Sequence, residues 1–482
     1  MRTSSLLLAS LLSMAACCAH RTQVGPSWPL PSVPPEKPYL LALASFQVKT
    51  PGAEAEAKAE QERLTKALAA LIGSEVVKLV PAPGEPPADA KQAVARVQSL
   101  GADGIVWGHV SLQEGKLTLQ RYFHHRSGWE ISGTWFPSTF EPADPEQLAV
   151  HEKEVRSFLQ FVLYGVNLGF MLDFQPEQSR RVLEALRPGQ DPGDFVTRNE
   201  GLIRRRWGMQ GRLVRDGKAT EDSYRSALAW VEEQRKLHLN DPDYKASSYD
   251  AQEALFSVGL ARGFLLQGRP QEVVPLLSRI VELRPEDVEV RQVLGRALLA
   301  LGERERAAQV LEPATRVGYD AVSTRMYMAA LAGQPEAAAR TREAFSTLFS
   351  KRPDTPLFQV FPYLVSAGKE TAELKALATS MPTAEWPQPV VRFLQGESDE
   401  ASLWTATKHP DAKTERENRC WGHYVLGEAA LAGVMPGRQG SPDRETARRH
   451  FEAALATHAF ATDAYNLADF QLEQLRRTEG KP

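Results

Sequence analysis

The sequence predicts an α+β fold in which a small mixed α/β domain precedes an α-helical repeat array. Residues 39–140 alternate short apolar runs with segments rich in Ala, Glu and Lys, which is the pattern of strands and helices in a compact domain. From residue 219 onward the chain is predicted to be helical, and a pattern of small and large apolar residues recurs after 34 positions. We expect the chain to divide into segments 1–16, 17–38, 39–140, 141–218 and 219–482.

The N-terminal segment 1–16 contains an apolar run, residues 6–16, that ends at two adjacent cysteines. As a helix this run spans roughly 16 Å, far less than the ~30 Å hydrocarbon core of a bilayer, so we expect a signal peptide rather than a membrane span. Residues 14–17 (MAAC) resemble the bacterial lipobox. The resemblance implies cleavage before Cys17 and attachment of a lipid such as palmitate to that residue. Cleavage after Ala19 is the alternative.

The segment that follows, residues 17–38, is expected to be a tether that starts at the lipidated cysteine. Six of the fifteen residues 24–38 are proline, which fixes φ and favours an extended chain. Beyond the two adjacent cysteines the chain has only Cys420, so its body relies on an apolar core rather than on disulfides. A net charge of −3 gives no electrostatic argument for nucleic acid as a partner.

Strands and helices alternate in residues 39–140 before three consecutive strands close the domain. We expect helices at 53–72 and 89–100 and strands at 39–48, 75–81, 104–113, 116–124 and 129–136. Strand–helix–strand units favour parallel pairing, whereas a Glu-Gly turn between the third and fourth strands favours an antiparallel hairpin. Residues 101–109 (GADGIVWGH) and the alternation of Leu117 and Leu119 resemble the N-terminal α/β domain of the Tol-B periplasmic translocation proteins. A helical connector is expected at 141–218.

A 34-residue period starts at Ala254. Leu260 and Ala261 occupy positions 7 and 8 of the first unit, and Leu294 and Gly295 occupy them in the second. Small residues at position 8 allow two antiparallel helices to approach closely, and large apolar residues at positions 7, 11 and 24 fill the seam between them. One helix pair cannot bury its own apolar face, so neighbouring pairs must stack. The period and pattern resemble the tetratricopeptide repeat, which implies a solenoid of helix hairpins.

The repeat pattern weakens in the flanking segments. A third unit with Gly333 and Ala338 is degenerate, and the pattern returns at Leu426. Residues 420–428 (CWGHYVLGE) and the later segment 447–457 resemble a family of bacterial tetratricopeptide-repeat lipoproteins. This resemblance implies an outer-membrane lipoprotein that scaffolds envelope enzymes such as peptidoglycan hydrolases.

In the tetratricopeptide repeat family, the first helix of each pair lines a concave groove. The resemblance therefore implies a partner-binding groove that includes Val258, Arg262, Leu265, Gln292, Arg296 and Leu299. Arg262 and Arg296 occupy the same position in consecutive units, and a pair of guanidinium groups suits a carboxylate, including a peptide C-terminus. The alternative is that both arginines solvate the groove edge or pair with neighbouring Glu residues.

Residues typical of catalysis or metal binding do not form a recognisable set in the sequence. Cys420 and His423 have the spacing of half a metal site, but no second Cys/His pair is near them in the sequence. We therefore expect Cys420 to be a buried structural residue on an apolar helix face, and we expect no metal, no cofactor and no enzymatic activity.

The expected function is that of a lipoprotein scaffold that is anchored to the outer membrane by its lipid alone and faces the periplasm. Its expected partners are other envelope proteins, such as peptidoglycan hydrolases or a secretion, motility or assembly machine, and not nucleic acid. Two alternatives stay open. One is an envelope enzyme or polysaccharide-binding module with its site in residues 39–140 and the repeats as a docking arm. The other is a secreted repeat protein without lipid.

Overall fold

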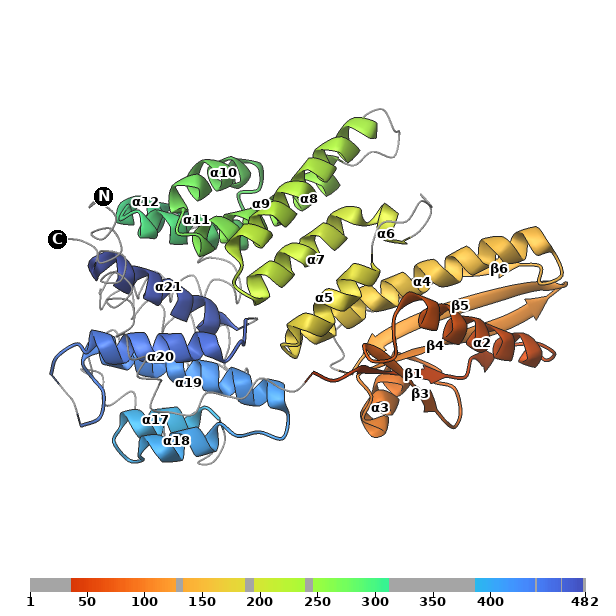
Figure 1. Ribbon diagram of the computed structural model, residues 1–482, viewed down its shortest axis with the longest axis horizontal. Helices are drawn as coiled ribbons and strands as arrows, with labels where there is room; N and C mark the ends of the chain where they lie inside the picture. Colours follow the sequence, from red (N-terminus) through yellow and green to blue (C-terminus); the bar gives the residue numbers. More distant parts are fainter. Residues whose placement is uncertain are drawn as a thin grey trace, which may run out of the picture.

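The computed structural model shows a mixed-sheet domain followed by a helical region, which confirms the predicted α+β fold (Figure 1). The structure describes residues 36–126, 133–186, 195–238, 246–311, 386–437, 440–460 and 462–479. The expected signal peptide 1–16, Cys17 with most of its tether, and the third repeat unit at Gly333 and Ala338 lie outside the described residues.

The sheet combines parallel and antiparallel strands in the order β3-β1-β4-β5-β6, and the short β2 pairs with β4 outside this order. The strands are β1 (Tyr39–Ala44), β2 (Gln47–Val48), β3 (Val77–Ala82), β4 (Gly104–Gln113), β5 (Lys116–His125) and β6 (Gly133–Phe140). β1 runs parallel to β3 and β4, whereas β4, β5 and β6 form an antiparallel meander. This is the pairing that the strand–helix–strand units and the hairpin turn predict.

Two strands differ from their predicted ranges. The expected strand 39–48 is interrupted after Ala44, and its end pairs with β4 as the separate strand β2. The last strand, β6, ends at Phe140 rather than at the expected residue 136, and the first part of the expected range, 129–132, lies outside the described residues. The register of β6 on β5 shifts between Leu119 and Arg121, which is a β-bulge or similar irregularity. Beyond this shift, Phe140 pairs with Leu117, and both side chains are buried.

Helices cover both faces of the sheet. α2 (Glu54–Leu71) and α4 (Pro145–Leu172) pack on one face, and α3 (Ala90–Leu100) packs on the other. Among the described residues, α4 is the one helix long and apolar enough to cross a membrane by length and composition. Most of its apolar stretch is buried inside the protein, as in the core helix of a folded domain.

A charged cluster is buried between the sheet and the α2–α4 layer. Arg121 of β5 is fully buried and donates to Glu60 of α2 over 2.8 Å and to the Ser138 hydroxyl over 2.9 Å. His151 of α4 lies 2.9 Å from the second Glu60 oxygen. Burial acts to raise the pKa of Glu60, but the bonds from His151 and Arg121 more than offset this and lower the pKa to about 2. The cluster therefore joins β5, α2 and α4 through a charged carboxylate.

The described residues of the connector and of the first repeats are largely helical. The helices are α5 (Pro176–Ala185), α6 (Phe195–Arg198), α7 (Glu200–Leu213), α8 (Gly217–Leu237), α9 (Ala246–Leu266), α10 (Pro270–Leu283), α11 (Val288–Ala300) and α12 (Arg304–Leu311). In the pair α11–α12, a Cβ atom on Gly295 would lie 2.6 Å from the Leu311 side chain. Glycine therefore allows the close approach that the sequence predicts between positions 8 and 24 of the repeat.

The C-terminal helices repeat this contact. They are α17 (Gln388–Leu394), α18 (Glu400–Ala406), α19 (Ala412–Ala432), α20 (Arg444–Ala456) and α21 (Asp463–Glu479). A Cβ atom on Gly427 of α19 would lie 2.4 Å from the Phe451 ring of α20. The same small-to-large contact thus holds two helix pairs that are far apart in the sequence.

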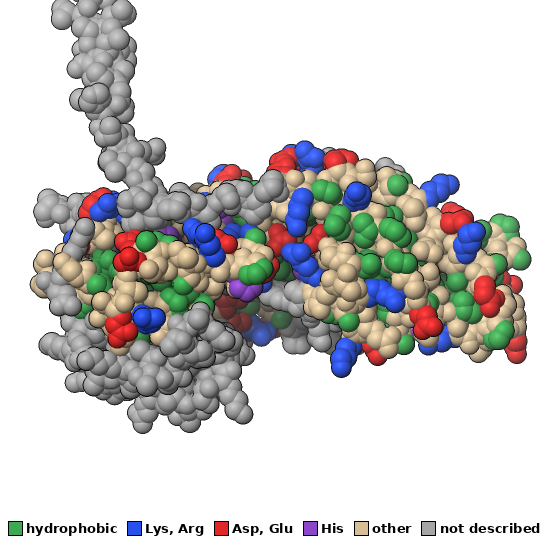
Figure 2. Space-filling model, turned by 90° about the horizontal axis from the view of Figure 1, so that it is seen from below, with side chains coloured by type: hydrophobic (Ala, Val, Ile, Leu, Met, Phe, Trp, Pro, Cys, Tyr) green, Lys and Arg blue, Asp and Glu red, His purple; other side chains and the backbone are tan. Residues whose placement is uncertain are grey.

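The chain folds back so that its C-terminal helices also touch the end of α4. Arg416 of α19 donates to the Leu172 carbonyl over 3.0 Å, and the His458 ring stacks on Phe174 with centroids 3.6 Å apart. On the molecular face in Figure 2, acidic and basic side chains are interspersed among the described residues. The described surface of this face therefore carries no extended field of a single sign.

Candidate functional site

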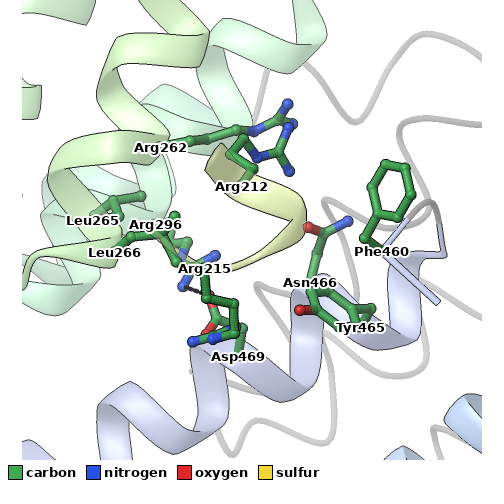
Figure 3. A pocket seen from close by; sticks show the side chains of 10 residues that line it. All are labelled: Arg212, Arg215, Arg262, Leu265, Leu266, Arg296, Phe460, Tyr465, Asn466 and Asp469. Atoms are coloured by element: carbon green, nitrogen blue, oxygen red, sulfur yellow. Dashed lines mark hydrogen bonds and ion pairs between the residues drawn. The ribbon is translucent and has the colours of Figure 1, made fainter. Parts of the chain in front are cut away.

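A pocket lies where the connector, the repeats and the C-terminal helix meet (Figure 3). Its polar lining comes from the end of α7, from α9, from α11 and from α21. Four arginines and one carboxylate dominate this lining: Arg212, Arg215, Arg262, Arg296 and Asp469. The repeat period places Arg262 on α9 and Arg296 on α11, and the fold brings both to this one pocket.

On one side of the pocket, the carboxylate of Asp469 lies between two guanidinium groups. Arg215 donates to one oxygen over 2.7 Å, and Arg296 donates to the other over 2.6 Å. Arg296 also lies 3.5 Å from Glu473, one helical turn along α21. Burial acts to raise the pKa of Asp469, but Arg296 and Arg215 more than offset this and lower the pKa to about 2. Charge-assisted bonds of this kind hold α21 against α11 and the end of α7.

On the other side of the pocket, Arg262 and Arg212 point toward the same space (Figure 3). Arg262 pairs with Glu289 over 2.7 Å, and Glu289 is 45% exposed. Arg212 is half-buried. Loss of hydration and, secondly, the charge of Arg262 lower the pKa of Arg212 to about 10. Arg212 still carries its positive charge at neutral pH.

The remaining residues of the predicted groove differ in exposure. Val258 and Leu299 are 2% and 6% exposed and belong to the hydrophobic core, so they present little surface to a partner in this conformation. Leu265 is also buried, but its side chain lines the pocket. Gln292 is half-buried on α11.

Three charged residues of the pocket were not predicted from the sequence. Arg212 and Arg215 belong to the connector, which carries no repeat pattern, and Asp469 belongs to the last helix. The partners of Asp469 are 173 and 254 residues away in the chain, so no local spacing indicates these contacts. A run of basic residues in the connector is the one sequence signal near Arg212.

A second anchor of α21 lies on its opposite side. The carboxyl of Glu428 is buried between α19 and α21 and accepts a hydrogen bond of 2.6 Å from Gln471. Burial raises the pKa of Glu428 to about 7, although the bonds from Gln471 and Tyr424 act in the opposite direction. α21 is thus held on one side by a hydrogen bond to a carboxyl group that is protonated below about pH 7, and on the other side by ion pairs.

Cys420 and His423, whose spacing in the sequence is that of half a metal site, lie in a buried part of the helical region. Cys420 is fully buried, and burial raises the pKa of its thiol to about 11. His423 faces His450 with 3.3 Å between their Nδ1 atoms, and the Trp404 ring lies beside it. Within the described part of the chain, no three His, Cys, Asp or Glu side chains are arranged to hold a metal ion.

The two helix pairs α9–α10 and α11–α12 stack beside one another and share one hydrophobic core. Residues 264–331 match the family model for the tetratricopeptide repeat. No curated protein matches the chain. The match and the stacked helix pairs support a tetratricopeptide repeat protein, and this repeat suggests a scaffold for protein–protein interaction.

Replacing Glu428 by Gln should stabilise the protein increasingly as pH rises. An unfolded Glu has a pKa of about 4.3, so between about pH 4 and 7 the folded chain holds a proton that the unfolded chain has lost. The stability that protonated Glu428 contributes is therefore complete below about pH 4 and is lost as pH rises through about 7. Glu428→Gln keeps an acceptor for Gln471 without this loss. Its advantage in unfolding free energy should grow by up to about 3 kcal/mol between about pH 4 and 8.

Urea unfolding at a series of pH values, followed by far-UV circular dichroism, measures this effect. Glu445→Gln on α20 is the matched control, because Glu445 is 72% exposed. A difference between wild type and Glu428→Gln that is the same at every pH would contradict the buried, protonated state of Glu428.

Proposed function

We propose that the chain is a lipid-anchored scaffold of the bacterial cell envelope, which sits on the outer membrane, faces the periplasm and holds other envelope proteins in its repeat groove. The tetratricopeptide match over residues 264–331 carries this proposal, because stacked repeats of this kind form extended concave surfaces that bind other polypeptides. The lipobox-like residues 14–17 support the anchor. The repeats require no chemical step, and we propose a binding role rather than an enzymatic one.

Partner binding is proposed at the pocket between α7, α9, α11 and α21. Arg262 is the residue best placed to contribute, since its side chain is 26% exposed and its present partner, Glu289, is itself exposed. Arg296 is 13% exposed and engages Asp469, so it supports the shape of the pocket. An acidic group of a partner could compete with Glu289 for Arg262 at little structural cost, because exposed ion pairs contribute little stability.

Mass spectrometry of the mature N-terminus tests the anchor. We expect the first residue to be Cys17 with a covalently attached lipid, because the lipobox-like sequence places cleavage directly before it. A mature chain that begins at His20 without lipid would rule out the anchored form and favour a secreted repeat protein.

Charge reversal at Arg262 tests the groove. Arg262→Glu should remove the main partner that co-purifies from detergent-solubilised envelopes, because the variant presents a negative charge where the partner's acidic group would bind. Arg279→Glu on α10 is the matched control, since Arg279 also pairs with a carboxylate, that of Glu253, over 2.9 Å but lies outside the pocket. Both variants should keep wild-type helical content by circular dichroism. Recovery of the same partner in equal yield with both variants would exclude the groove.

A further inference from the structure

One of the four arginines of the pocket has no carboxylate partner among the described residues. Asp469 forms ion pairs with two of the four arginines, those on either side of it. Glu289 forms an ion pair with a third, Arg262. The guanidinium group of Arg212, the fourth arginine, makes no hydrogen bond or ion pair with any residue that the structure describes. The pocket therefore holds a cationic group that forms no direct ion pair with its described surroundings.

This arrangement is unfavourable without an anion. Arg212 is half-buried, and its guanidinium group lies beside that of Arg262, whose charge lowers the pKa of Arg212 more than the charge of Glu289 raises it. Two like charges in partly dehydrated surroundings repel each other, and the guanidinium group of Arg212, unlike that of Arg262, has no described hydrogen-bond partner that replaces its lost hydration. An oxyanion between them would supply the opposite charge and would accept hydrogen bonds from both guanidinium groups.

The other walls of the pocket fit such a group. Leu265 and Leu266 of α9 and Phe460, which precedes α21, give the pocket apolar lining. Apolar walls reduce local hydration, so a charge-assisted hydrogen bond between them is stronger than one in open water. Asn466 of α21 lies across the pocket from Arg212 and adds a side-chain amide to the lining (Figure 3).

We infer that Arg212 and Arg262 form the cationic half of a binding site for an oxyanion, either a carboxylate or a phosphate group, whose far wall is α21. The inference extends the proposed partner groove, because an acidic group of a bound polypeptide would occupy this site. Anion binding itself needs no partner protein, so the site can be tested on the purified chain alone. Because α7, α9 and α21 all line the site, a bound anion should also stabilise the packing of these helices against one another.

The test follows the thermal unfolding of the purified full-length chain while anions are added at constant ionic strength. The probes are inorganic phosphate, N-acetyl-leucine, its uncharged amide N-acetyl-leucinamide, and sodium chloride as the reference. We expect Tm to rise to a plateau with phosphate or with N-acetyl-leucine, and not with the amide. A response to phosphate alone assigns the site to a phosphate group. A response to N-acetyl-leucine alone assigns it to a carboxylate, such as one carried by a polypeptide.

Two variants connect the response to the pocket. Arg212→Gln should weaken anion affinity roughly tenfold or more, because a charge-assisted bond is lost. Its Tm in sodium chloride should not fall below that of wild type, since the guanidinium group of Arg212 makes no bond to the described residues. Arg205→Gln, two turns earlier on α7 and outside the pocket, should respond as wild type does.

The outcomes separate this site from the partner groove. No rise in Tm beyond that in sodium chloride, or an equal rise in wild type and Arg212→Gln, would overturn the oxyanion site. An intact, Arg212-dependent anion response combined with unchanged partner recovery by Arg262→Glu would reject the partner groove while supporting the oxyanion site.

Discussion

The arrangement of the helical region depends on one carboxylate. Asp469 lies on the last helix, α21, and bridges Arg215, which lies in the turn after α7, and Arg296 on the second repeat unit, over 2.7 and 2.6 Å. Asp469 and Arg296 are only 17% and 13% exposed, so water screens their attraction weakly, and loss of either group would leave a poorly hydrated charge behind. This bridge, together with the buried Glu428–Gln471 contact, places α21 beside the repeats as one wall of the arginine pocket.

The helix pairs themselves could be predicted from the sequence because their decisive contacts are local. Gly295 and Leu311 lie on the two helices of one hairpin, and so do Gly427 and Phe451. The spacing of small and large residues within a hairpin therefore indicates which side chains will be in contact. The strand–helix alternation of the N-terminal domain works in the same way, since each unit buries its apolar face on a neighbour in the chain. The end of β6 was less well predicted, because its pairing depends on an irregularity near Arg121 that no period reveals.

The pocket could be predicted only in part, because it is built from contacts between distant segments. The repeat period indicates that Arg262 and Arg296 belong to equivalent positions, but it carries no information about α21, whose Asp469 is 173 residues from Arg296. Arg212 was missed for the same reason, since the connector has no repeat pattern that would assign its side chains to a face. The buried Glu60–Arg121–His151 cluster is a further example, because charges on three separate elements become partners only after the sheet has formed. The periodicity of apolar residues thus predicts the helices and strands, whereas ion pairs between distant elements determine how these elements pack against one another.

The most direct test of this account is a double-mutant cycle between Arg296 and Asp469, read from the hydrogen exchange of the α21 backbone amides. The free energy of local opening of α21 is measured for wild type, Arg296→Gln, Asp469→Asn and the double variant. If the ion pair holds α21 in place, the two substitutions should not be additive, and the coupling energy should be about 1–3 kcal/mol. Additive effects with a coupling energy near zero would show that α21 is held on the repeats by other contacts, and the central claim would be wrong.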